Sequence, residues 1–144
     1  MMTGKMTRIV LVAVAAIFAL VILSVQGTIF PPIMMPPSSF LPVFIFFAIW
    51  DAVAFGVGIA ILIYLALSYS KWPKELRSSL LVLSFIAVWF TTLNWVHDGL
   101  HNTGAMPPNW ALLAFTEFTF HVPWLIFGLA LVFVIRQLIT VSKK

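Results

Sequence analysis

The sequence of 144 residues contains no cysteine and very few charged side chains. The absence of cysteine excludes disulfide bonds and thiolate metal sites. Charged residues make up 8% of the chain and apolar residues 62%, whereas soluble domains contain about 25% charged and about 45–50% apolar residues. A soluble protein of this composition could not cover its surface with polar groups. We therefore expect a single membrane-embedded domain over residues 1–144.

Four apolar segments are long enough to cross a bilayer as helices, for which about 20 residues suffice. The predicted fold class is all-α, an integral membrane four-helix transmembrane bundle. A signal peptide is the alternative for the first segment, but its apolar run is long and no A-x-A-like cleavage site follows it. We expect the spans at about residues 8–26, 41–68, 78–101 and 109–135.

Small residues recur every four positions in the first two segments. They are Ala15 and Ala19 in the first segment, and Ala48, Ala52, Gly56 and Ala60 in the second. This spacing places the small side chains on one helix face, where the backbone of a neighbouring helix can approach closely. We expect both faces to pack against another helix.

Prolines and an asparagine predict where the helices are interrupted. Five prolines between residues 28 and 42 separate the first two segments, because proline cannot continue a helix. Asn109 is a residue type that caps helix N-termini, so we expect the fourth helix to begin after it. Pro123 lies inside that helix and should bend it near residue 119.

All eight Lys and Arg residues fall at one end of the predicted bundle. The loops 27–40 and 101–109, at the other end, contain none. The positive-inside rule then predicts a multi-pass protein of the plasma (inner) membrane with both termini in the cytoplasm. The basic residues are scattered over segment ends and do not cluster on one face, so the net charge of +4 does not indicate nucleic-acid binding.

The few ionisable residues of the spans concentrate toward the outer end. At about 1.5 Å of rise per residue, His101 lies at the outer surface, His97 about 6 Å below it, Glu117 about 12 Å, Asp51 about 15 Å and His121 about 18 Å. Because an ionisable group facing lipid is costly, we expect the helices to turn these groups inward. We expect Asp51 to pair with Glu117 or His121.

Helical periodicity groups the polar residues of the last two spans on single faces. The face of the third span contains Asn94, His97, Asp98 and His101, and that of the fourth contains Trp110, Glu117, His121, Trp124 and Gly128. These faces indicate a polar track that leads from the outer surface toward the middle of the membrane.

Two histidines four residues apart can ligate one metal ion, and carboxylates add oxygen ligands. The candidate ligands are His97, His101, His121, Glu117, Asp51 and Asp98, and the candidate metals are copper, zinc and iron. A haem held by two histidines is disfavoured, because His97 and His121 differ by roughly 12 Å in depth. The sequence assigns no catalytic residue.

Three functions remain open. The leading hypothesis is a non-catalytic accessory subunit of a larger membrane complex, for example a copper membrane monooxygenase or a terminal oxidase. Its partners would be membrane lipid and other membrane subunits or further copies of itself. The alternatives are a stand-alone membrane metalloprotein, an oxidoreductase if it is an enzyme, and a small proton-coupled transporter that uses Asp51 and Glu117. A purely structural interpretation makes Glu117 and His121 an intrahelical pair that supports packing.

Overall fold

A computed structural model describes residues 4–31, 35–93, 95–96 and 109–144, and these residues form helices and turns without strands. The elements are α1 (Gly4–Ile29), α2 (Leu41–Ser68), the 3-10 helices η1 (Tyr69–Lys71) and η2 (Lys74–Leu76), α3 (Arg77–Val88), the π-helix η3 (Trp89–Leu93) and α5 (Trp110–Val141). Four stretches of helix are long and apolar enough to cross a membrane, as predicted: Gly4–Ile29, Leu41–Lys71, Lys74–Leu93 and Trp110–Val141.

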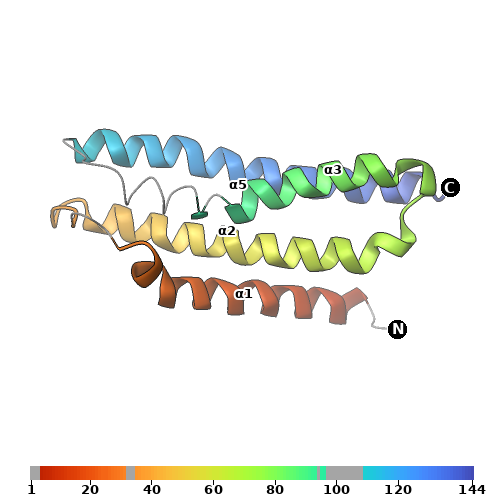
Figure 1. The fold of residues 1–144 in the computed structure, drawn as a ribbon, viewed down its shortest axis with the longest axis horizontal. Helices are drawn as coiled ribbons and strands as arrows, with labels where there is room; N and C mark the ends of the chain where they lie inside the picture. The colour runs from red at the N-terminus through yellow and green to blue at the C-terminus, as the bar shows by residue number, and fades with distance from the viewer. Residues whose placement is uncertain (1–3, 32–34, 94, 97–108) are drawn as a thin grey trace.

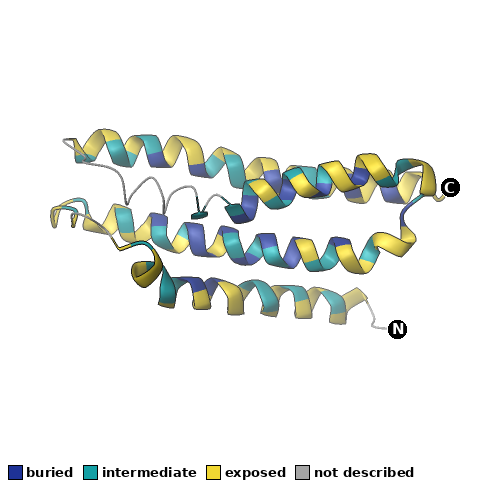
Figure 2. Ribbon diagram, in the orientation of Figure 1, coloured by how far each residue is buried: buried dark blue, intermediate teal, exposed yellow. Residues whose placement is uncertain are grey.

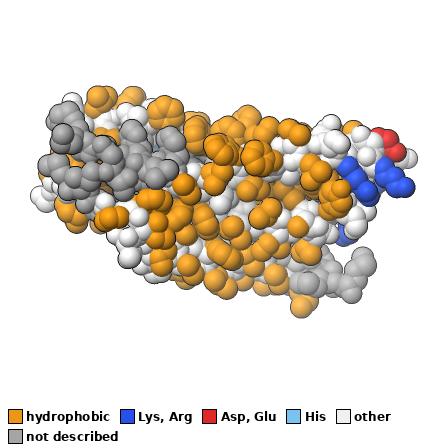
Figure 3. All heavy atoms as spheres, viewed as in Figure 1, with side chains coloured by type: hydrophobic (Ala, Val, Ile, Leu, Met, Phe, Trp, Pro, Cys, Tyr) orange, Lys and Arg blue, Asp and Glu red, His pale blue; other side chains and the backbone are white. Residues whose placement is uncertain are grey.

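The helices run alongside one another along the long axis of the molecule (Figure 1). In this view α1 packs on one side of α2, and α3 and α5 lie on the other side. The start of α1 and the C-terminus lie at one end, next to the turn between α2 and α3. The Lys and Arg side chains visible in Figure 3 gather at this end, which we call the basic end. Helices α2 and α5 both begin at the opposite end and therefore run parallel.

The contact between α1 and α2 joins the two small-residue faces predicted from the sequence. A Cβ atom added at Gly56 would overlap the backbone oxygen of Ala15 and would lie 3.1 Å from the backbone nitrogen of Ala19. Ala52 and Ala60 on α2 are buried as well. The two backbones approach as closely as they do because glycine has no side chain at this point.

Helix α5 begins where the sequence predicted. The Asn109 side chain accepts a hydrogen bond from the Leu112 backbone N–H at 3.0 Å, which caps the first turn. The helix then continues through Pro123 to Val141, six residues beyond the predicted end of the span at 135. A helix need not end where the apolar run ends, since the helix satisfies its own backbone hydrogen bonds.

Helix α3 changes its hydrogen-bonding pattern at Trp89, where the π-helix η3 begins. The sequence predicted one regular helix through this region. Thr91 and Thr92 of η3 are both buried, and the Thr91 hydroxyl donates to the backbone oxygen of Ala87 at 2.9 Å. Added Cβ atoms would overlap the Thr92 hydroxyl at Gly58 and would lie 2.6 Å from Thr91 Cγ2 at Gly128. Glycines on α2 and α5 thus make room for both threonines.

Burial follows the helix faces, with buried positions between the helices and exposed positions around them (Figure 2). Toward the basic end, one apolar cluster joins α2, α3 and α5; it consists of Ile61, Leu65, Trp72, Leu80, Ile135 and Ile139. The outer faces carry many large apolar side chains, which Figure 3 shows over the length of the bundle. Such a surface suits contact with acyl chains, in keeping with helices that are long and apolar enough to cross a membrane.

Candidate functional site

Two ionisable side chains meet between α2 and α5 because the two helices start at the same end. Asp51 lies ten residues after the first residue of α2, and His121 lies eleven residues after the first residue of α5. At about 1.5 Å of rise per residue, both positions lie roughly 15–17 Å from the starts of their helices. The inward faces of the two helices therefore present the two side chains at the same depth.

The imidazole of His121 lies between two carboxyl groups. Its Nε2 atom is 3.0 Å from Oδ1 of Asp51 across the helix interface. Its Nδ1 atom is 2.5 Å from the backbone oxygen of Glu117 and 3.4 Å from Oε2 of the same residue, one turn earlier in α5. Of the two partners predicted for Asp51, Glu117 and His121, the structure places His121 in contact with it. We call the three residues the Asp–His–Glu cluster.

The Asp–His–Glu cluster is buried between the helices. Asp51 and Glu117 are each 7% exposed and His121 is 1% exposed. The buried ring of Phe47, one turn before Asp51 in α2, lies 5.6 Å from the His121 ring and 6.5 Å from the Phe118 ring. These aromatic neighbours replace water on one side of the imidazole, and electrostatic interactions are stronger in such a low-dielectric setting.

The contacts of the imidazole require a proton between His121 and Asp51. A backbone carbonyl can only accept, so Nδ1 must carry a hydrogen and donate it to the Glu117 oxygen. The Nε2–Oδ1 contact at 3.0 Å then holds one further hydrogen. Either the imidazole is doubly protonated and Asp51 is a carboxylate, or the imidazole is neutral and Asp51 is a carboxylic acid. Both arrangements place one exchangeable proton on the Nε2–Oδ1 line.

The cluster contains three of the six predicted metal ligands. The other three, His97, Asp98 and His101, lie outside the described residues, as does Asn94 on the predicted polar face of the third span. Over residues 4–31, 35–93, 95–96 and 109–144, no group of three or more His, Cys, Asp or Glu side chains has an arrangement that could hold a metal ion. Copper, zinc or iron binding therefore stays a prediction.

The predicted polar face of α5 turns inward. Glu117, His121 and Gly128 are buried, and Trp110 and Trp124 are half-buried. Trp124 contacts the ring of Phe90, with 5.4 Å between ring centroids, so the stripe also joins α5 to η3. The periodicity of the sequence identified this face correctly.

Sequence reasoning missed the two threonines and the apolar cover. Thr92 Oγ1 is buried and has no hydrogen-bond partner among the residues that the structure describes. Thr91 and Thr92 lie against Gly58, seven residues and about 10 Å along α2 from Asp51. Adjacent threonines inside an apolar span were a usable signal, and π-helices occur often at functional sites. Phe47 carried no such signal, because phenylalanine is common throughout this chain.

Comparison of the chain with models of protein families, with curated proteins and with solved structures finds no match. The chemistry of the Asp–His–Glu cluster is therefore argued from its own geometry.

Proposed function

We propose that this protein is a multi-pass membrane protein that takes up and releases a proton at the Asp–His–Glu cluster. The observation that carries the proposal is the 3.0 Å contact between Asp51 Oδ1 and His121 Nε2 inside the spanning segments. Ionisable groups within membrane spans commonly serve ion or proton pathways. Histidine is also the side chain that exchanges a proton near neutral pH.

The geometry supports a two-step transfer through the imidazole. A proton that arrives on Asp51 passes from Oδ1 to Nε2, which leaves a carboxylate and a doubly protonated imidazole. Once the bond from Nδ1 to the Glu117 backbone oxygen opens, its hydrogen can move to Oε2 of Glu117, 3.4 Å from Nδ1, and the imidazole becomes neutral again. The ring has exchanged one proton for another, and the charge of the cluster as a whole changes only when a proton enters or leaves it.

Proton uptake by the purified full chain tests this function. In unbuffered detergent solution, a pH step should release or take up protons in proportion to the protein, with a matching change in the infrared carbonyl band of a protonated carboxylic acid. Asp51→Asn keeps a hydrogen-bonding group of similar size but removes the acid. We expect Asp51→Asn to lose the part of the proton release and of the infrared change that comes from the cluster. Glu75→Gln, which replaces an exposed acid between α2 and α3, should retain both. Equal proton release by Asp51→Asn and the unaltered chain would refute the proposal.

We further propose that the chain lies in the plasma membrane with both termini in the cytoplasm. The support is the position of the basic residues, which lie in the first turns of α1, around the turn between α2 and α3, and at the end of α5. In that orientation the basic end is cytoplasmic, because basic residues are retained on that side. The Asp–His–Glu cluster then belongs to the outer half of the membrane.

A second proposal is that the chain is an accessory subunit of a larger membrane complex. Within the described residues, only 11% of the positions in an apolar 18-residue stretch of α1 are buried, and 17% of those in the corresponding stretch of α5. Both helices therefore offer long apolar faces to lipid or to other subunits. Oxidoreductases of the copper monooxygenase or terminal oxidase kind consume protons and would use such a site.

Purification from native membranes in a mild detergent tests the subunit proposal. We expect the chain to elute with other membrane proteins in fixed proportion and at a mass well above its own 16.1 kDa plus detergent. Elution as a lone chain under several detergents would contradict it and would leave the proton site untouched.

A further inference from the structure

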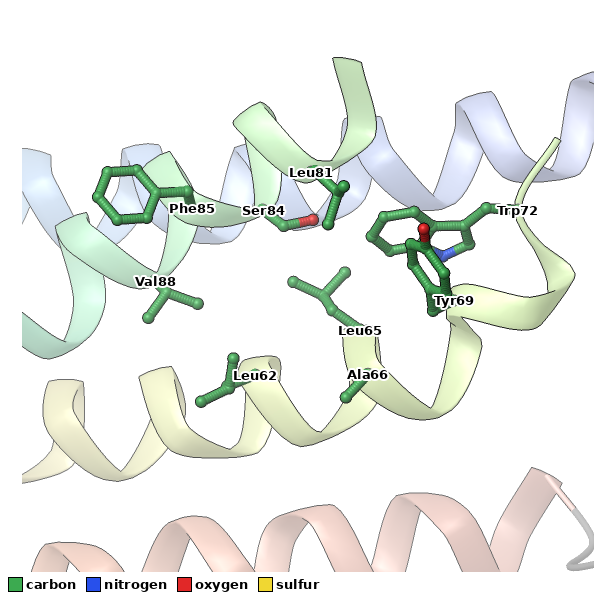
Figure 4. A pocket seen from close by; sticks show the side chains of 9 residues that line it. All are labelled: Leu62, Leu65, Ala66, Tyr69, Trp72, Leu81, Ser84, Phe85 and Val88. Atoms are coloured by element: carbon green, nitrogen blue, oxygen red, sulfur yellow. The ribbon is translucent and has the colours of Figure 1, made fainter. Parts of the chain in front are cut away.

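A groove lies between α2 and α3 near the basic end, apart from the Asp–His–Glu cluster. Its volume is about 500 Å³, and residues on both helices and the turn between them line it. Figure 4 shows these residues: Leu62, Leu65, Ala66, Tyr69, Trp72, Leu81, Ser84, Phe85 and Val88. The walls are apolar apart from Ser84 and the aromatic pair, and Ser84 donates its hydroxyl hydrogen to Leu80 within its own helix.

The groove runs along the helices for roughly 10 Å, from Leu62 on α2 to Tyr69 at the start of η1. Figure 4 places Tyr69 and Trp72 at the end next to the α2–α3 turn, and Leu62 and Val88 toward the other end. The groove opens to the outer surface of the bundle, because two of its lining residues, Leu81 and Phe85, are 49% and 67% exposed. An apolar slot of this direction fits an acyl chain that lies along the bilayer normal.

The turn beside the groove carries uncompensated positive charge. Residues 69–77 contain Lys71, Lys74 and Arg77 against one acid, Glu75, so their net charge is 3 − 1 = +2. The guanidinium of Arg77 lies 5.2 Å above the ring of Tyr69, which itself lines the groove. Among the described residues, Arg77 has no carboxylate partner, and its buried Nε has no hydrogen-bond acceptor.

We propose that this groove binds one anionic phospholipid, with an acyl chain between α2 and α3 and the phosphate at Arg77. Aromatic side chains such as Tyr69 and Trp72 favour the headgroup level of a membrane. Basic pockets between spanning helices on the cytoplasmic side bind anionic headgroups. Charge complementarity at the groove mouth favours an anionic lipid over a zwitterionic one with the same chains.

Lipid retention by the full chain tests the site. The protein is purified in neutral detergent, incubated with phosphatidylglycerol or phosphatidylcholine of identical acyl chains, and weighed by native mass spectrometry. We expect one phosphatidylglycerol molecule per chain to be retained at concentrations where phosphatidylcholine is lost. Arg77→Gln should weaken phosphatidylglycerol binding about fivefold, the effect of one basic residue near a membrane surface.

Two matched controls separate a site from general attraction. Arg136→Gln removes an exposed charge from the same end of the molecule, and Ala130→Phe enlarges an exposed position on α5, both outside the groove. These variants should bind like the unaltered chain, whereas Ala66→Phe, which fills the groove, should abolish retention. Leu81→Trp fills the groove from α3 and replaces Ala66→Phe if that variant does not fold.

Three results would overturn the lipid site. The first is equal retention of the two lipids by the unaltered chain. The second is an equal loss in Arg77→Gln and Arg136→Gln, which would show attraction without a site. The third is a dimer that disappears in Ala66→Phe, because a second copy would then occupy the groove. None of these results bears on proton exchange at Asp51.

Discussion

His121 on α5 and Asp51 on α2 face each other across a helix interface with 3.0 Å between Nε2 and Oδ1. The two residues are 70 positions apart in the chain, yet they occupy equal depth in the bundle. Glu117 adds a second carboxyl group on the other side of the imidazole. The histidine is therefore the centre of the cluster.

The Asp51–His121 contact should contribute measurably to stability. In a double-mutant cycle with Asp51→Ala and His121→Ala, unfolding in mixed micelles should give a coupling free energy of about 1–2 kcal/mol, at the upper end of the values for membrane hydrogen bonds. As a control, Asp51→Ala should be additive with Thr140→Ala within about 0.5 kcal/mol, because Thr140 lies at the far end of α5. If Asp51→Ala and His121→Ala are also additive within about 0.5 kcal/mol, the contact between the two residues does not contribute to stability.

Gly56 should be required for the packing of α1 on α2. Gly56→Ala should lower the free energy of unfolding by about 1–3 kcal/mol, since the added methyl group overlaps the Ala15 backbone. Gly27 provides the matched control: it lies within α1 with no neighbouring atom in reach of an added Cβ. Gly27→Ala should leave stability unchanged or raise it by up to about 1 kcal/mol. If both substitutions change stability equally, the predicted close contact between the backbones of α1 and α2 at Gly56 is refuted.

Gly58 should be required to accommodate the Thr92 side chain, and a second substitution at Thr92 can test this. Gly58→Ala alone should destabilise the protein by about 1–3 kcal/mol, because the new methyl group overlaps the Thr92 hydroxyl. Thr92→Ala removes that hydroxyl, so the double variant should recover part of the loss. The measurement is again unfolding in mixed micelles, with Gly58→Ala in the presence and absence of Thr92→Ala. Strict additivity of the two changes would show that they do not meet.

The proposed orientation can be tested by single-cysteine labelling, because the chain has no cysteine of its own. In intact cells, a membrane-impermeant thiol reagent should modify Ser38→Cys, in the turn before α2, without disruption of the membrane. Lys74→Cys and Lys144→Cys should react only after the cells are opened. The reverse pattern would invert the orientation, and labelling of Lys74→Cys and Lys144→Cys from opposite sides would contradict the four-span arrangement itself.

Much of the architecture could be predicted because it depends on properties read along the chain. Apolar length identifies the membrane-length helices, and the period of 3.6 residues identified the face of α5 that contains Glu117 and His121. Asn109 could be recognised as a cap for the same reason, since a cap acts on the next turn of its own helix. The small residues at Ala15 and Gly56 indicated that close helix contacts exist, but they did not say which helices make them.

The π-helix and the apolar cover could not be predicted in this way. Whether α3 keeps a regular hydrogen-bonding pattern at Trp89 depends on how Thr91 and Thr92 fit against Gly58 and Gly128 on two other helices. Phe47 is one of 14 phenylalanines, and only its contact with the His121 ring sets it apart. Such contacts join residues whose separation in the chain carries no periodic signal.

By itself, the sequence determined that long apolar helices form and that Asp51, Glu117 and His121 turn away from the surface. Hydrocarbon thickness and the cost of exposed charge act on each helix separately, so local composition is sufficient. Only the tertiary structure decided that Asp51 meets His121, that α1 packs on Gly56, and that a groove beside Arg77 stays open. These outcomes depend on which helix faces come into contact, and close packing between distant segments settles that.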